Sequence, residues 1–286
     1  MVLYFGDPRG ALALLDRAVP LVGVVHGRRG GAGRQALTPR IAALPRWTLP
    51  DLGDPRVVER LAALRPRLIV AAFYPRRIPA PVLALAPGLN VHPSPLPRFR
   101  GPDPCAWSIR TGDPETEVCV QWLAEGLDEG DVLERVRVPV GPRDNAGTLA
   151  ERCEALGAER IAEVAVQVLA GRAPVASPQV GEVVWAPLLP PDDAEIDWRR
   201  DAVEVDRFVR AAFPHPIAFT GIGQETIGVL AGTPVEAERF EVLPPGTPFV
   251  RGGLAYVRCG RGALRLDRVR LGGRTLDGRR FASLLV

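Results

Sequence analysis

An apolar run that ends in polar residues and prolines constrains this chain more than any other feature. The run that closes at Val91 carries Asn90 and His92 two positions apart, so on a strand both side chains project from the same face. Prolines follow at positions 93, 95 and 97, and proline continues neither a helix nor a central strand. The pattern predicts a stiff loop at the carboxyl end of a strand, where open α/β sheets place their ligand sites. The alternative is that Asn90 and His92 end a buried strand and bond only to backbone.

Short apolar runs alternate with helix-like segments through the first half of the chain, which is typical of parallel βαβ units. Strands are predicted at 2–5, 21–25, 68–72 and 89–92, all of the buried, nearly continuous apolar kind. Helices are predicted at 10–18, 55–64, 80–85, 104–111 and 148–170. The last helix is the best defined, because Thr148 and Glu151 match a capping box and Gly171 supplies a stop.

The composition changes after the long predicted helix. Residues 172–193 are rich in proline and lack periodicity, which indicates a linker running over the surface. Asp201 is expected to cap a helix at 202–213. Short strands that suggest a small β-barrel are predicted at 217–220, 226–230, 239–243, 254–257 and 263–269. The sequence therefore predicts an α/β domain at 1–175, a linker at 176–198 and a β-barrel domain at 199–286.

A second polar segment follows the strand-like run 118–123. The segment Gly126-Leu127-Asp128-Glu129-Gly130-Asp131 presents carboxylates on a glycine-flanked turn. An Asn, a His and an Asp brought together supply the parts for proton transfer and oxyanion stabilisation without a covalent nucleophile.

Composition argues against several other kinds of protein. The four cysteines are scattered without a C-x-x-C pair and only three histidines are present, so neither a disulfide framework nor a metal site is expected. No apolar stretch approaches the roughly 20 residues that span a bilayer, and no signal peptide is visible. We expect a cytoplasmic protein with no membrane partner.

All basic charge in this chain comes from arginine, because the sequence contains no lysine. The formal net charge of +3 does not by itself indicate a nucleic-acid partner. One glycine-rich segment, 27–34, nevertheless carries Arg28, Arg29 and Arg34, whose guanidiniums are suited to gripping phosphate. A solvated surface loop is the equal alternative.

The two polar segments together resemble the paired signatures of the formyltetrahydrofolate-dependent formyltransferases. The matching patterns are Asn90-x-His92-x-Ser94-x-Leu96-Pro97-x-x-Arg100-Gly101 and Gly126-Leu127-Asp128-x-Gly130-Asp131. Residues 192–198, 210–216 and 262–266 are similar to the branch of the family that acts on methionyl-tRNA. The resemblance implies a Rossmann-like, mostly parallel sheet with helices on both faces, followed by a small OB-like β-barrel.

The resemblance also implies the reaction, which is transfer of a formyl group from the co-substrate 10-formyltetrahydrofolate to a primary amine, without a metal. Asn90 is expected to hold the developing oxyanion, and His92 to donate to it or to move the proton. Asp128 is expected to orient His92. Asp131 and Glu129 are rival carboxylates, and Asp131 is better explained as a turn-capping aspartate.

Further residues are assigned to binding by the same resemblance. Folate is expected to lie against Ser94, Pro95, Leu96 and Pro97 on one side and against Phe73, Tyr74 and Ile78 on the other. Arg100 is expected to hold the carboxylates of the folate tail or the phosphate of the acceptor, or else to brace its loop through an ion pair. Arg28, Arg29 and Arg34 are assigned to substrate or RNA.

The identity of the amine is the open question at this point. Initiator methionyl-tRNA is favoured, and an amino-sugar nucleotide or another small amine is the alternative, because Pro95-Leu96 and the segment after Gly101 depart from the pattern of the methionyl-tRNA branch. A formyltetrahydrofolate hydrolase is less favoured, as is a non-catalytic binding module, since no catalytic position is degenerate.

Overall fold

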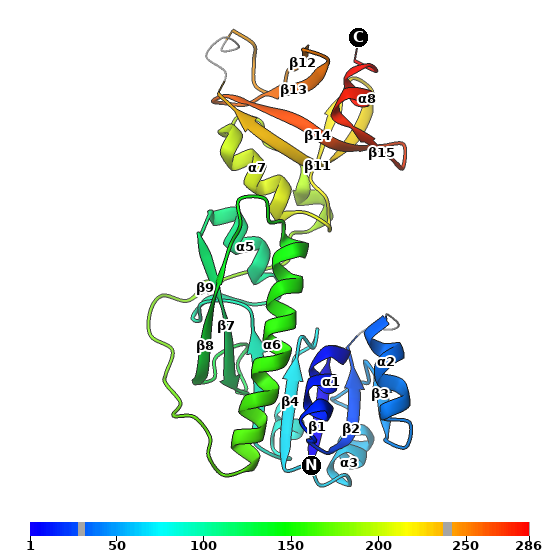
Figure 1. Cartoon of the computed structure of the whole chain (residues 1–286), viewed down its shortest axis with the longest axis vertical. Helices are drawn as coiled ribbons and strands as arrows, with labels where there is room; N and C mark the ends of the chain where they lie inside the picture. The colour runs from blue at the N-terminus through cyan, green and yellow to red at the C-terminus, as the bar shows by residue number, and fades with distance from the viewer. Residues whose placement is uncertain (28–31, 237–241, 286) are drawn as a thin grey trace. The chain divides into compact units, whose positions relative to one another are not determined.

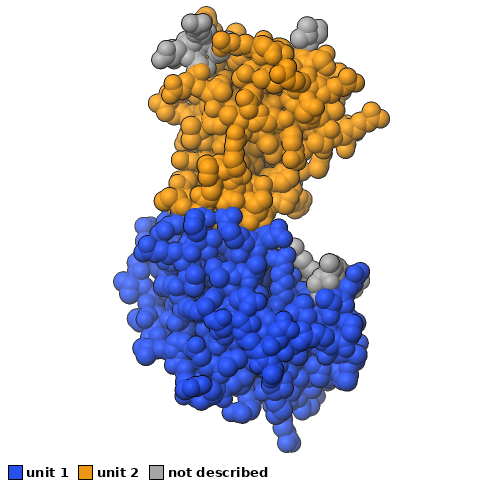
Figure 2. Space-filling model, viewed as in Figure 1, with its two compact units in different colours: residues 1–104, 115–139, 150–186 blue, residues 105–114, 140–149, 187–286 orange. Residues whose placement is uncertain are grey.

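The computed structural model describes residues 1–27, 32–236 and 242–285, which form two compact units (Figures 1 and 2). The first unit contains residues 1–104, 115–139 and 150–186, and the second contains residues 105–114, 140–149 and 187–286. Two short segments, 105–114 and 140–149, therefore group with the C-terminal half. The domain boundaries at 175 and 199 stay predictions.

A seven-stranded sheet with the order β3-β2-β1-β4-β5-β7-β8 forms the centre of the first unit (Figure 1). Its strands are β1 (Val2–Gly6), β2 (Leu21–His26), β3 (Arg46–Thr48), β4 (Leu68–Ala72), β5 (Gly88–His92), β7 (Glu115–Trp122) and β8 (Val132–Pro139). The first five are parallel, whereas β7 runs antiparallel to both β5 and β8. The predicted mostly parallel sheet is confirmed.

Helices cover both faces of this sheet. They are α1 (Pro8–Asp16), α2 (Ala32–Arg40), α3 (Pro55–Ala62), α4 (Ala80–Leu83) and α6 (Ala146–Leu169), of which α6 belongs to the first unit from Ala150 onward. Leu3 and Phe5 of β1 pack with Leu61 of α3 and Val82 of α4 in one buried cluster. The alternate residue, Tyr4, faces α1, where it lies against Gly10.

The long helix α6 decides which way the polar residues of β5 point. A Cβ placed on Gly157 of α6 would lie 2.9 Å from Val91 and 3.0 Å from the ring of Phe73, so the helix packs closely on that side of the strand. Because successive side chains alternate across a strand, Asn90 and His92 point to the opposite face.

Residues 177–186, here called the strap, run alongside the end of the sheet rather than away from it. The strap begins with two backbone hydrogen bonds between Ser177 and Val132 of β8, at 2.8 and 2.9 Å. It ends in the short strand β9 (Val184–Trp185), which pairs in parallel with β6 (Arg98–Arg100). The region that the sequence marks as a surface linker is therefore bonded to β8 at its start and to the loop that follows β5 at its end.

The second unit is built on an antiparallel sheet with the order β10-β11-β14-β13-β12, and β15 pairs with β14. Its strands are β10 (Phe219–Ile222), β11 (Glu225–Val235), β12 (Pro248–Arg251), β13 (Leu254–Arg258), β14 (Ala263–Leu271) and β15 (Arg274–Asp277). Its helices are α5 (Pro104–Thr111), α7 (Ala202–Ala211) and α8 (Gly278–Ala282), and η1 (Pro191–Ala194) is a 3-10 turn. Val205 and Val209 of α7 pack against Val257, Leu264 and Leu266. The sheet curls into a half-barrel (Figure 1), which confirms the predicted α/β unit followed by a small β unit.

One local expectation differs from the structure, and another is largely untested. The helix α6 begins at Ala146, and Asn145 rather than Thr148 provides the cap, since Asn145 Oδ1 accepts from the Thr148 N–H at 3.0 Å. The Thr148 hydroxyl instead donates to Asp144 at 3.0 Å. The strand predicted at 239–243 falls largely on residues outside the described part of the chain.

None of the helices among the described residues is long and apolar enough to cross a membrane.

Candidate active site

Asn90, His92 and Asp128 meet on the face of β5 that lies away from α6. Asn90 Nδ2 donates to Asp128 Oδ1 at 3.2 Å, and His92 Nδ1 lies 3.5 Å from Asp128 Oδ2. The side chains of His92 and Asp128 are only 6% and 7% exposed, so their interaction is weakly screened by water. The structure thus brings together the three side chains to which the sequence assigns the chemistry.

The protonation of His92 follows from its second ring nitrogen. His92 Nε2 lies 2.8 Å from the backbone oxygen of Phe99. A carbonyl oxygen only accepts hydrogen bonds, so Nε2 carries a proton. Nδ1 is then the nitrogen that gains or loses a proton, and it is the one that faces Asp128.

Asp128 is held in an unusual backbone conformation by several donors. Its φ of 55° lies in the left-handed region, which aspartate adopts more readily than most residues. Oδ1 accepts from Asn90 and from Gln121 Nε2 at 3.3 Å, while Oδ2 accepts from the Gly101 N–H at 3.0 Å. The carboxylate is therefore satisfied by donors and oriented toward the imidazole.

The rival carboxylates lie elsewhere on the same turn. Asp131 is exposed, and its backbone oxygen accepts from the Trp122 N–H at 3.0 Å. Glu129 is also exposed and forms an ion pair with Arg100 at 3.5 Å. Neither carboxylate has a described contact with His92, so the choice of Asp128 agrees with the geometry.

Two glutamines that were not predicted from the sequence also belong to the site. Gln121 of β7 is 1% exposed and lies opposite Asn90 in the sheet register. Gln179 of the strap donates to Gln121 Oε1 at 3.2 Å and to the backbone oxygens of Asp128 and Gly130 at 2.8 Å each. A polar residue inside the apolar run 118–123 was a visible signal for Gln121, whereas nothing in the proline-rich segment marked Gln179.

Comparison with known proteins shows the family to which the chain belongs. Residues 26–165 match the family model described as formyl transferase, and residues 188–284 match the one described as formyl transferase, C-terminal domain. A methionyl-tRNA formyltransferase of Symbiobacterium thermophilum is 34% identical over 99% of this chain and 91% of its own length. The protein of the same name from Pseudomonas syringae pv. syringae is 35% identical over 96% of this chain and 92% of its own length.

The chain belongs to the formyltransferase family. The family and the enzyme class predicted from the two motifs are therefore confirmed.

Solved structures agree with the fold. An N-formyltransferase from Helicobacter canadensis, in complex with folinic acid and dTDP-3-aminofucose, superposes with a TM-score of 0.69 at 12% identity, covering 93% of this chain and 98% of that one. HypX from Aquifex aeolicus, in complex with tetrahydrofolic acid, gives a TM-score of 0.65 at 21% identity. That match covers 98% of this chain and 46% of HypX.

The loop to which this formyltransferase's folate contacts are assigned is tightly packed. Ser94 is fully buried, and its hydroxyl donates to the backbone oxygen of Arg98 at 2.8 Å. Leu96 packs with Cys119 and Val132, and the peptide bond before Pro97 is cis. Pro95 is half-buried. Folate contact by these four residues stays a prediction.

The residues of the second predicted folate wall pack inside the first unit. Ile78 is 5% exposed and belongs to the buried cluster around Phe5, and the Tyr74 ring meets Phe5 edge-on at 5.4 Å. Phe73 faces α6. Burial raises the pKa of the Tyr74 hydroxyl, and Arg76 lowers it to a smaller extent. These contacts give Tyr74, Ile78 and Phe73 roles in packing, and their contact with folate stays a prediction.

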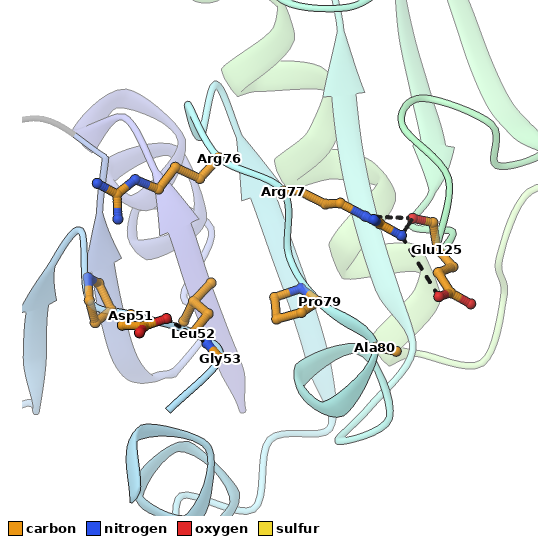
Figure 3. A pocket seen from close by; sticks show the side chains of 9 residues that line it. Asp51, Leu52, Gly53, Arg76, Arg77, Pro79, Ala80 and Glu125 are labelled. Carbon is orange, nitrogen blue, oxygen red and sulfur yellow. Dashed lines mark hydrogen bonds and ion pairs between the residues drawn. The ribbon is translucent and has the colours of Figure 1, made fainter. Parts of the chain in front are cut away.

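A cavity of about 630 Å³ lies beside this wall (Figure 3). It is lined by Pro50, Asp51, Leu52, Gly53, Arg76, Arg77, Pro79, Ala80 and Glu125. Arg77 crosses to Glu125 and donates twice to its backbone oxygen, at 3.0 and 2.6 Å, while Arg76 donates to the backbone oxygen of Leu49 at 3.3 Å. Asn90, His92 and Asp128 do not line this cavity.

Of the four arginines predicted to bind substrate, only Arg100 has a side chain in the described part of the structure. Arg28 and Arg29 lie outside the described residues, and Arg34 belongs to α2, with its side chain outside the described part. The Arg100 side chain is 12% exposed and donates to Gln179 Oε1 from Nε at 3.1 Å and from Nη2 at 2.8 Å. Its guanidinium therefore lies within the network around Asp128. Among the described residues, no group of three or more His, Cys, Asp and Glu side chains is placed to hold a metal ion.

Proposed function

We propose that this formyltransferase moves the formyl group of 10-formyltetrahydrofolate to the amino group of methionyl-tRNA. The convergence of Asn90, His92 and Asp128 on one face of β5 is the observation that carries the chemistry. The names of the relatives, together with the arginine-rich C-terminal part of the second unit, support the acceptor.

The reaction makes and breaks one carbon–nitrogen bond. The neutral amine attacks the formyl carbon, which places negative charge on the formyl oxygen and positive charge on the attacking nitrogen. The bond from the formyl carbon to N10 of the folate then breaks, and the proton of the amine passes to N10. An enzyme accelerates this sequence by stabilising the oxyanion and by moving the proton.

The three side chains are suited to these two tasks. Asn90 has two N–H groups, and since one donates to Asp128, the other is available for the formyl oxygen. His92 Nδ1 exchanges the proton, because the proton on Nε2 is committed to the backbone oxygen of Phe99. Asp128 stabilises the imidazolium that forms when Nδ1 takes a proton.

The C-terminal part of the second unit, residues 242–286, is rich in arginine, which suits a nucleic-acid partner. Residues 242–286 contain nine arginines against two aspartates. The exposed arginines among them are Arg251, Arg261, Arg268, Arg270, Arg274, Arg279 and Arg280. Exposed arginines hold phosphates in a salt-dependent way.

The test is formyl transfer by the purified protein from 10-formyltetrahydrofolate to methionyl-tRNA, to a dTDP-linked amino sugar, or to no added acceptor. Formylation of methionyl-tRNA is expected. Transfer to the amino sugar alone would show that the acceptor is a small amine, and release of tetrahydrofolate without an acceptor would show a hydrolase. No reaction with any of them would overturn the catalytic function.

The contribution of the exposed C-terminal arginines is tested separately. Replacing Arg268 and Arg270 of β14 together by Ala should raise KM for methionyl-tRNA and reduce its salt dependence, because two cationic contacts to phosphate are lost. KM for the folate should not change. The matched control replaces Arg56 and Arg172, two exposed arginines of the first unit, by Ala. An equal effect of both double variants would contradict a tRNA surface on β14.

A further inference from the structure

We propose that Gln179 is a positioning residue for formyl transfer, which holds the turn that carries Asp128 and, through Gln121, one oxygen of its carboxylate. The inference rests on the proposed function, because it assigns a support role to a residue behind the same three side chains.

The orientation of the Gln179 amide is determined by its partners. Its Nε2 faces the backbone oxygens of Asp128 and Gly130 at 2.8 Å and Gln121 Oε1 at 3.2 Å. Its Oε1 accepts from Arg100 at 3.1 and 2.8 Å. A guanidinium can only donate and a carbonyl can only accept, so the opposite orientation of the amide would lose all of these hydrogen bonds.

The hydrogen bond from Gln179 also determines the orientation of the Gln121 side-chain amide. Because Gln121 Oε1 accepts from Gln179, its Nε2 is turned toward Asp128 Oδ1 at 3.3 Å. Donation therefore runs in one direction, from Arg100 through Gln179 and Gln121 to the carboxylate. Without Gln179, the buried amide of Gln121 is free to turn its oxygen toward Asp128, where two acceptors repel each other.

Gln179 also holds the backbone of the turn itself. Asp128 has a φ of 55°, a conformation that persists only where its surroundings maintain it. Gln179 binds the carbonyl oxygens on both sides of Glu129, those of Asp128 and Gly130. A turn held at these two points keeps the Asp128 carboxylate near Nδ1 of His92.

The strap fixes the position of Gln179 in turn. Ser177, two residues before it, is bonded to β8, and Val184 and Trp185, a few residues after it, pair with β6. The segment is thus anchored on both sides of the glutamine, and the side chain needs little further ordering to reach the turn.

The test compares three variants of the full-length protein. Gln179→Met keeps the size of the side chain but removes every hydrogen bond, and Gln179→Glu keeps an acceptor for Arg100 but removes the N–H donors. Gln167→Met, on an exposed position of α6, is the matched control. Steady-state kinetics with 10-formyltetrahydrofolate and methionyl-tRNA are measured beside the melting temperature and the binding of folinic acid.

Both Gln179 variants should lower kcat by about 10- to 100-fold, as expected when a catalytic group is misplaced by a fraction of an ångström to 1 Å. KM for the folate and the affinity for folinic acid should stay within about twofold, since ground-state binding does not depend on the alignment of Asp128. The melting temperature should fall by a few degrees relative to Gln167→Met, because several hydrogen bonds of Gln179 are lost. This division between kcat and KM is not expected from general damage to the fold.

Three outcomes would overturn the inference. A kcat within about twofold of the wild-type value for Gln179→Met would show that the turn holds itself. Full activity of Gln179→Glu would show that the N–H donors are not needed. A loss that appears in folate affinity and melting temperature instead of kcat would show a merely structural role. Absence of transfer by the wild-type protein would overturn the proposed function as well, so the two failures are distinguishable.

Discussion

The loop 93–101 and the strap 177–186 are two proline-containing segments that meet beside the same carboxylate, yet they differ in how they reach it. The loop follows β5 directly and brings Gly101, whose N–H donates to Asp128 at 3.0 Å. The strap comes from a distant part of the chain and brings Gln179, which bonds to the backbone of the turn. The comparison shows that one contact to Asp128 comes from a segment that directly follows β5, while another comes from a segment that only folding brings near.

The largest effect is expected from the motif residues themselves. His92→Ala and Asp128→Asn should each lower kcat by about 10²- to 10⁴-fold, the range for losing general acid–base catalysis, with little change in melting temperature. Asp131→Asn, at an exposed position on the same turn, is the control and should stay near wild type. Near-normal formylation by His92→Ala would show that His92 does not carry the chemistry.

Gly101 of the loop lies close to Ala186, the last residue of the strap. Its φ is 118°, and an added Cβ would lie 3.0 Å from the backbone oxygen of Ala186. Gly101→Ala should therefore lower the free energy of unfolding by about 1–3 kcal/mol, the usual cost of a strained backbone, and should also lower kcat because the donor to Asp128 shifts. Urea unfolding and steady-state kinetics measure both effects. Gly221→Ala, where no atom lies within 4 Å of the added Cβ, is the control, and equal unfolding free energies for the two variants would contradict the close contact.

A smaller effect is expected from loosening the strap at its start. Ser177→Pro removes the N–H that donates to the Val132 oxygen at 2.9 Å. One lost backbone hydrogen bond should lower the free energy of unfolding by about 0.5–1.5 kcal/mol. If the strap positions Gln179, kcat should fall while KM for the folate is unchanged. Ser177→Ala keeps the N–H and serves as the control. Unaltered kcat in Ser177→Pro would show that β9 alone holds the strap.

The smallest effect concerns Cys119, which lies beneath the loop and donates to the Ser94 backbone oxygen at 3.1 Å. Burial raises the pKa of its thiol from 9.0 to about 12, although Arg135 lowers it somewhat. A raised pKa means that the contribution to stability is complete below about pH 9 and is lost as the pH rises toward 12, because the unfolded chain ionises first.

Two measurements check this assignment. Iodoacetamide near neutral pH should leave the native Cys119 unmodified and the activity unchanged, since only the thiolate reacts. Urea unfolding should show a steeper alkaline loss of stability for the wild-type protein than for Cys119→Ala. Rapid alkylation of native Cys119 would show that the loop opens readily.

Local pattern was sufficient for much of the fold. The apolar runs at 2–5, 21–25, 68–72 and 89–92 correspond to β1, β2, β4 and β5, because a strand buried on both faces has a nearly continuous apolar sequence. Pattern was insufficient for the short strands β3, β6 and β9, whose three or fewer residues depend on pairing with a distant partner. The start of α6 was also misplaced, since both Asn145 and Thr148 are good caps and the surrounding structure decides between them.

The sequence by itself determined the family, the α/β and β units, and the three side chains of the candidate site. Those conclusions depend on residue type and spacing, which remain visible in a linear chain. Tertiary structure decided which donors surround Asp128 and that a proline-rich segment belongs to the site. Gln121 lies on β7, the strand next to β5, and Gln179 follows Asp128 by 51 positions along the chain. Their contacts with Asp128 are therefore hydrogen bonds between separate segments of the chain. Such bonds leave no periodic or local signal, and only the folded chain brings their partners together.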